Sequence, residues 1–62
     1  MQEGEARREQ LLQMLRDSTA PIPGSALARS LGVSRQVIVQ DIALLRASGY
    51  DIISTNRGYV LE

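Results

Sequence analysis

Apolar positions recur with a helical period near the start of the chain. Leu11 and Leu15 lie one turn apart, the spacing of a helical stripe that faces a core. Two prolines follow shortly after Asp17, and proline cannot continue a helix. The pattern therefore predicts a first helix over residues 5–17, with residues 1–4 disordered. Its apolar side consists of Leu11, Leu12, Met14 and Leu15.

A shorter periodic segment comes next. Leu27 and Leu31 form an i, i+4 pair, which predicts a second helix over residues 24–31 with these two side chains buried. Gly32 follows, and glycine often ends a helix because a left-handed backbone carries no Cβ penalty there. The candidates for the N-cap of this helix are Pro23 and Ser25.

The third periodic segment has one apolar face and one face of small and polar residues. Ser34 is a favoured N-cap, and it is predicted to open a helix that runs to about Ala47. At about 100° per residue, the core face consists of Ile38, Ile42 and Leu45. Val37 and Leu44 flank that face and are expected to touch neighbouring elements. The opposite face consists of Gln36, Val39, Gln40, Ala43 and Ala47, with Arg35 at its edge.

A β-hairpin is predicted after Gly49, which ends the third helix. Short strands at residues 52–54 and 59–61 flank a loop that ends in Gly58, which is a hairpin signal. Arg57 is expected at the exposed tip. The alternation points three side chains inward, namely Ile52, Tyr59 and Leu61. The predicted fold is therefore mainly α with a small β-hairpin, a three-helix winged helix-turn-helix.

The length limits the chain to one small domain, residues 1–62. A domain this short buries only about 60% of the surface of its unfolded chain. It has no cysteine, so no disulfide can stabilise it. No apolar run approaches the ~20 residues of a membrane span, and the start of the chain lacks the apolar core of a signal peptide. We therefore expect a cytoplasmic protein with no membrane partner.

Charge is balanced overall but uneven along the chain. Seven arginines match seven acidic residues, and a net charge of zero argues against strong non-specific binding to nucleic acid. The segment 29–58 is richer in cations. Its charged residues are Arg29, Arg35, Arg46 and Arg57 against Asp41 and Asp51. If these arginines share one face, the domain is locally cationic.

The composition argues against catalysis. The chain has no histidine and no cysteine, which removes zinc sites, Cys/His or Ser/His nucleophile pairs and an imidazole base. We predict that the chain is not an enzyme. Asp41 is expected to pair with an arginine or to cap locally. Arg7 and Arg8 are interpreted as solvated charges. Tyr50 and Tyr59 are interpreted as covers of the core.

The start of the third helix carries the side chains best suited to read DNA. In a helix-turn-helix, the N-terminal residues of the recognition helix meet base edges in the major groove. Arg35 could contact the O6 and N7 atoms of guanine, or it could bind a phosphate or form an ion pair. Gln36 and Gln40 have the amide geometry to read adenine, or they are solvated surface.

Three further positions complete the predicted surface. Ser34 caps the helix and is placed to contact a phosphate at the helix N-terminus. Val39 could meet a thymine methyl group or belong to a protein interface. Arg57 would reach the minor groove or the DNA backbone, or it serves only the solubility of the turn. The expected partner is a double-stranded DNA operator. We also expect a homodimer in the intact protein, because so few arginines neutralise too few phosphates for tight binding.

The run Gly-Val-Ser-Arg-Gln-Val-Ile-Val-Gln-Asp-Ile resembles the N-terminal winged helix of niacin-responsive transcriptional repressors of the NiaR type, as do Leu-Arg-Ala-Ser-Gly-Tyr-Asp-Ile and Arg-Gly-Tyr-Val-Leu. The likeness extends from about Glu9 to Leu61. Members of that family repress genes of NAD biosynthesis or niacin uptake when nicotinate is bound. The resemblance implies a bacterial DNA-binding repressor whose DNA-facing positions are Ser34, Arg35, Gln36, Gln40 and Arg57.

The same resemblance implies a C-terminal effector domain that senses nicotinate and holds a metal ion. That domain is absent from this chain, and without histidine none of its ligand or metal residues carries over. We therefore expect no cofactor here. Pro23 also stands where related domains often have a capping Ser or Thr, which bears on the cap and not on the fold.

Two other functions stay open. The regulatory winged helix of biotin-ligase repressors shares Gly-Val-Ser-Arg and a closing Gly-Tyr with this chain. A winged helix used only for protein interaction would need a contiguous exposed apolar patch, for which the candidates are Val37, Val39 and Leu44.

Overall fold

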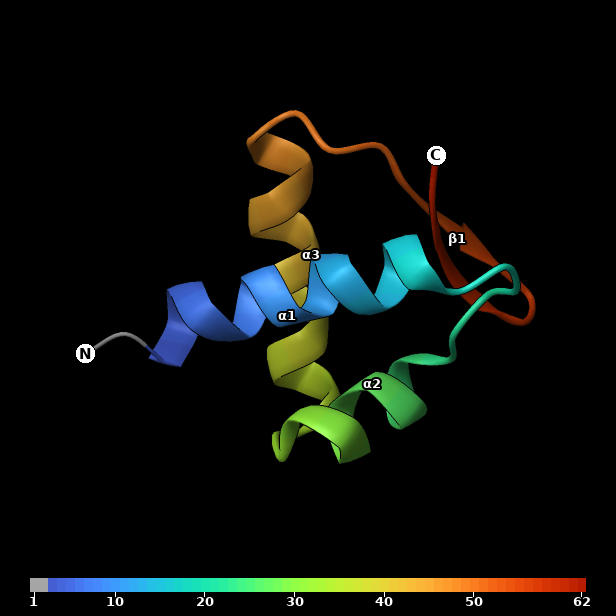
Figure 1. Ribbon diagram of the computed structural model, residues 1–62. Helices are drawn as coiled ribbons and strands as arrows, with labels where there is room; N and C mark the ends of the chain where they lie inside the picture. Colours follow the sequence, from blue (N-terminus) through green and yellow to red (C-terminus); the bar gives the residue numbers. More distant parts are fainter. Residues whose placement is uncertain (1–2) are drawn as a thin grey trace.

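The computed structural model describes residues 3–62, which form three helices followed by one hairpin (Figure 1). The elements are α1 (Glu3–Asp17), α2 (Gly24–Leu31), α3 (Arg35–Ala47), β1 (Ile52–Thr55) and β2 (Gly58–Leu61). α1 packs against both other helices and against β2, and it crosses α3 in Figure 1. The fold is thus the predicted winged helix-turn-helix.

α1 begins at Glu3, two residues before the predicted start at residue 5. The expectation of disorder is therefore wrong for Glu3 and Gly4, while residues 1 and 2 lie outside the described part of the chain. The earlier start of α1 is explained by contacts in its next turn. There Arg7 and Arg8 form ion pairs with α3, which anchor this end of the helix.

The core lies where the three helices meet the base of the hairpin. Its buried apolar residues are Leu11, Leu12, Leu15, Leu27, Ala28, Ile38, Ile42, Leu45 and Ile52. The predicted core faces of α1 and α3 are confirmed by this set. The predicted burial of Leu31 is wrong, because it lies at the end of α2 and is only partly buried at the core edge. Met14, Tyr59 and Leu61 are also only partly buried there.

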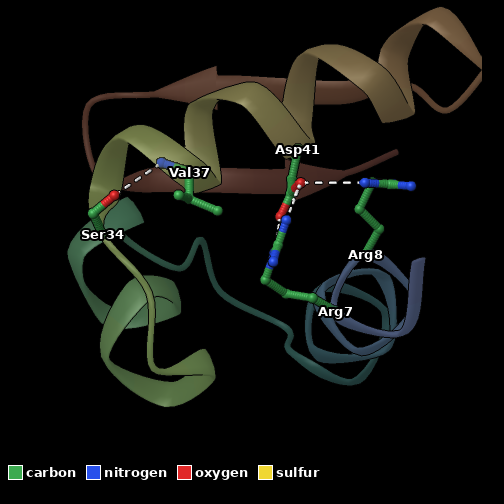
Figure 2. Close-up of polar contacts among 5 residues, drawn as sticks. All are labelled: Arg7, Arg8, Ser34, Val37 and Asp41. Carbon is green, nitrogen blue, oxygen red and sulfur yellow. Dashed lines mark hydrogen bonds and ion pairs between the residues drawn. The ribbon is translucent and has the colours of Figure 1, made fainter. Parts of the chain in front are cut away.

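The turn between α2 and α3 forms as the sequence predicts. Gly32 has a φ of 70°, in the left-handed region. The Val33 N–H donates to the Ala28 carbonyl at 3.0 Å, the long bond of a Schellman motif. Pro23 is the N-cap of α2 and supplies no side-chain cap. Ser34 caps α3, and its Oγ accepts from the Val37 N–H at 3.2 Å (Figure 2).

Replacing Ser34 with Ala should lower the free energy of unfolding by about 1 kcal/mol, because one N–H at the start of α3 loses its acceptor. Chemical denaturation followed by circular dichroism measures this change. Ser34→Asp keeps an acceptor at the same place and should retain most of the stability. Equal losses for both variants would show that the hydroxyl does not act as a cap.

The hairpin is one residue longer on each strand than predicted, so its loop contains only Asn56 and Arg57. The side chain of Thr55 explains the extension. Its Oγ1 accepts from the Arg57 and Gly58 N–H groups, both at 3.1 Å, and it donates to the Gly58 carbonyl at 2.8 Å. This local network closes the turn at the first cross-strand pair, Thr55 and Gly58.

A backbone bridge attaches the hairpin to the segment between α1 and α2. The Ile22 N–H donates to the Tyr59 carbonyl at 3.0 Å, and the Tyr59 N–H donates to the Ile22 carbonyl at 2.8 Å. Ile22 thus pairs with β2 on the edge that β1 leaves open. This bridge has no signal in the local sequence pattern.

Candidate nucleic-acid interface

α3 presents a continuous accessible face on the side opposite the core. Gln36, Gln40 and Ala43 are exposed, and Val39 is 55% exposed. Arg35 begins the helix and is also exposed. The predicted DNA-reading side chains are therefore unobstructed within residues 3–62. Their contact with bases stays a prediction.

An open cleft of about 390 Å³ separates the start of α3 from the hairpin. Its walls come from three places that are distant in the sequence, and Arg35 and Arg57 both line it. The other lining residues are Pro23, Gly24, Ser25, Ser54, Thr55, Asn56, Gly58 and Tyr59. The fold therefore brings the two predicted cationic contacts to one opening, which local sequence patterns could not show.

Asp41 is buried, with 1% of its surface exposed, although it belongs to the recognition helix. Arg7 binds it with two hydrogen bonds, one from Nε to Oδ2 and one from Nη2 to Oδ1 at 3.0 Å (Figure 2). Arg8 Nη1 lies 3.5 Å from Oδ1. Pairing of Asp41 with an arginine is thus confirmed, and the interpretation of Arg7 and Arg8 as solvated charges is wrong. The crossing of α1 over α3 brings these charges together.

The four arginines of segment 29–58 have different surroundings. Arg46 is engaged with β1, where its Nε donates to the Ile52 carbonyl at 2.8 Å and its Nη2 donates to the Ser54 Oγ at 3.1 Å. The side chains of Arg29, Arg35 and Arg57 form no hydrogen bond or ion pair with other described residues. Of these three arginines, Arg35 and Arg57 share one surface, because both line the cleft.

Some flanking positions are more exposed than predicted. Leu44 is 51% exposed because its position lies about 100° around α3 from the buried Leu45, and Tyr50 is 37% exposed. Tyr50 does not belong to the residues packed against the core, so its interpretation as a core cover is not supported. Val37 is half-buried, and Val39 and Leu44 are separated by about 140° around the helix. The contiguous apolar patch that an interaction-only function requires does not form on α3.

Two kinds of feature are missing from residues 3–62. No helix there combines the length and hydrophobicity needed to cross a bilayer. No group of three or more metal-ligating side chains is assembled within the same residues.

Comparison with known proteins agrees with this geometry. Residues 7–60 match the family model described as HTH domain. The chain is 54% identical to the transcription repressor NadR of Bacillus subtilis over 57 residues, which cover 92% of the chain and 32% of that protein. It is also 54% identical to the probable transcription repressor NiaR of Thermotoga maritima over 55 residues, 89% of the chain and 31% of that protein. The resemblance to NiaR-type repressors is thereby confirmed, and the chain spans about a third of the length of these relatives. The chain belongs to the HTH, or helix-turn-helix, domain family.

Proposed function

We propose that this chain is the sequence-specific double-stranded-DNA-binding domain of a bacterial transcription repressor. One observation carries the proposal: the first residue of α3, Arg35, and the tip of the hairpin, with Arg57, line the same cleft. The similarity to two proteins named as transcription repressors supports it. α3 then enters the major groove, and the hairpin acts as a wing on the adjacent backbone or minor groove.

Each exposed side chain has a distinct role in this proposal. Arg35 contacts guanine or the neighbouring phosphate, and Gln36 and Gln40 read adenine edges. Val39 packs against a thymine methyl group. Arg57 contacts the backbone from the wing. Ser34, besides capping α3, lies at the helix N-terminus, where the backbone N–H groups favour an anion.

The wider biological role is proposed from the resemblance to NiaR-type repressors. We infer that the intact protein controls genes of NAD biosynthesis or niacin uptake, and that a further domain binds nicotinate and a metal ion. We also infer that it is a homodimer. The two arginines that line the cleft, Arg35 and Arg57, neutralise few phosphates, and two copies on a two-fold symmetric operator double that number.

Arg35→Ala should weaken binding to the preferred duplex by about 1–3 kcal/mol, because a bidentate base contact is lost. The probe is a fluorescent duplex enriched by the unaltered chain from a pool of random sequences. Fluorescence anisotropy at several salt concentrations gives the affinity. Binding to scrambled duplex should change much less.

Arg16→Ala is the matched control, because Arg16 is an exposed arginine at the end of α1, away from the cleft. It removes one positive charge and should leave the affinity nearly unchanged. Failure to enrich any duplex would refute the proposed function. An Arg35→Ala loss no larger than that of Arg16→Ala would refute the role of Arg35.

A further inference from the structure

The side chain of Arg46 binds to the outer edge of β1. Glu62 N–H donates to the Asp51 carbonyl at 2.9 Å, so the backbone groups of residues 51, 53 and 55 face β2. The carbonyl of Ile52 consequently faces away from β2, and Arg46 Nε donates to it at 2.8 Å. Nη2 of the same guanidinium extends along the strand to the Ser54 Oγ. One arginine from the last turn of α3 thus attaches to β1 at two points, one backbone carbonyl and one side-chain hydroxyl.

The two edges of the hairpin are held by different means. Ile22 holds the β2 edge through two backbone hydrogen bonds to Tyr59. Within β1, only Ile52 is buried, and Ile53, Ser54 and Thr55 are exposed. Packing therefore does not hold the outer half of β1 against α3. A two-stranded hairpin is marginally stable alone, so its orientation depends on such attachments.

We propose that Arg46 is a positioning residue for DNA binding, which fixes the wing relative to the recognition helix without contacting DNA itself. Its acceptor Ser54 lines the same cleft as Arg35 and Arg57. The fork of Arg46 thereby sets the distance between the base-reading end of α3 and the tip of the wing. This inference rests on the proposed function and adds a residue outside the predicted contact surface.

Arg46→Ala should bind the enriched duplex about fivefold more weakly, because the wing loses its attachment to α3. The slope of log affinity against log salt concentration should stay unchanged, since no phosphate contact is removed. Arg57→Ala should reduce that slope by about one if Arg57 contacts a phosphate. Adding Arg46→Ala to Arg57→Ala should then cost little more, because the wing has already lost the contact that Arg46 positions.

Two further measurements separate positioning from a general loss of stability. Arg46→Lys keeps the charge, but its single ammonium lacks the fork that spans both acceptors, so it should also bind more weakly than the unaltered chain. In the protein without DNA, ¹⁵N relaxation should show increased motion at residues 54–58 in Arg46→Ala. Arg16→Ala serves as control in both measurements.

The proposal is overturned if Arg46→Lys binds like the unaltered chain, or if the losses from Arg46→Ala and Arg57→Ala multiply and the salt slope falls for both. Those results would make Arg46 a direct phosphate contact. Unchanged relaxation at residues 54–58 would also overturn it. If no duplex is enriched at all, the proposed function fails, whereas the relaxation of the free protein still decides whether Arg46 holds the wing.

Discussion

Arg7→Met should lower the free energy of unfolding by about 3–5 kcal/mol, because it leaves the buried Asp41 carboxylate without its two-bond partner. Arg8, at 3.5 Å, offers only a weaker substitute. A domain of this size has a total stability of roughly 3–9 kcal/mol, so the variant should lose much of its folded population at ambient temperature. Urea denaturation followed by circular dichroism measures the loss.

Two companion variants identify the cause. Arg8→Met removes the more distant charge and should cost less than Arg7→Met. The double variant Arg7→Met with Asp41→Leu removes both the buried charge and its partner, and apolar side chains then fill the space between α1 and α3. It should recover most of the stability lost in Arg7→Met. No recovery would mean that packing of the Arg7 stem, and not pairing of charge, stabilises this contact.

Gly58→Ala should destabilise the protein by about 3–4 kcal/mol. Gly58 has a φ of 141°, which L side chains rarely adopt, and such strain costs about 1–3 kcal/mol. A Cβ there would also lie 2.3 Å from the backbone carbon and oxygen of Ile22. Ile22 must then move away, and its two hydrogen bonds to Tyr59 are lost. Thermal unfolding measures the loss of stability, and amide exchange of Tyr59 measures the loss of its hydrogen bonds to Ile22.

Gly32→Ala is the matched control for this prediction. Gly32 also has a positive φ, of 70°, but an added Cβ would meet nothing within 4 Å. Its cost should therefore be the left-handed backbone strain alone, about 1–2 kcal/mol. If Gly58→Ala costs no more than Gly32→Ala, the close approach of Ile22 to the hairpin does not contribute to stability.

Both predictions concern contacts that hold the candidate DNA-binding surface in place. The pairing of Arg7 with Asp41 joins α1 to the middle of the recognition helix. The approach of Ile22 to Gly58 joins the wing to the segment before α2. The accessible face of α3 and the tip of the wing contribute no buried apolar residue, so these attachments help to hold them in place, together with the core packing of α3 and of Ile52.

Several elements of the fold were determined by the sequence alone, because their causes are local. The period of Ile38, Ile42 and Leu45 identifies the core face of α3, and Ser34 and Gly32 mark the turn before it. The exposure of the opposite face follows from the same period. Local patterns also predicted the hairpin, although they missed the Thr55 network that extends it.

Only the tertiary structure decided which charged side chains are exposed for binding and which are paired within the domain. Asp41 follows Ile38 by three positions on the core side of α3, and this spacing is a signal for its burial. Its partners, however, come from a helix more than thirty positions earlier. Arg46 also binds β1 only because the chain turns back after α3. For the same reason, Arg35 and Arg57 line one cleft although they are distant in the sequence. Periodicity and capping act within a few residues, whereas these contacts depend on how the elements cross.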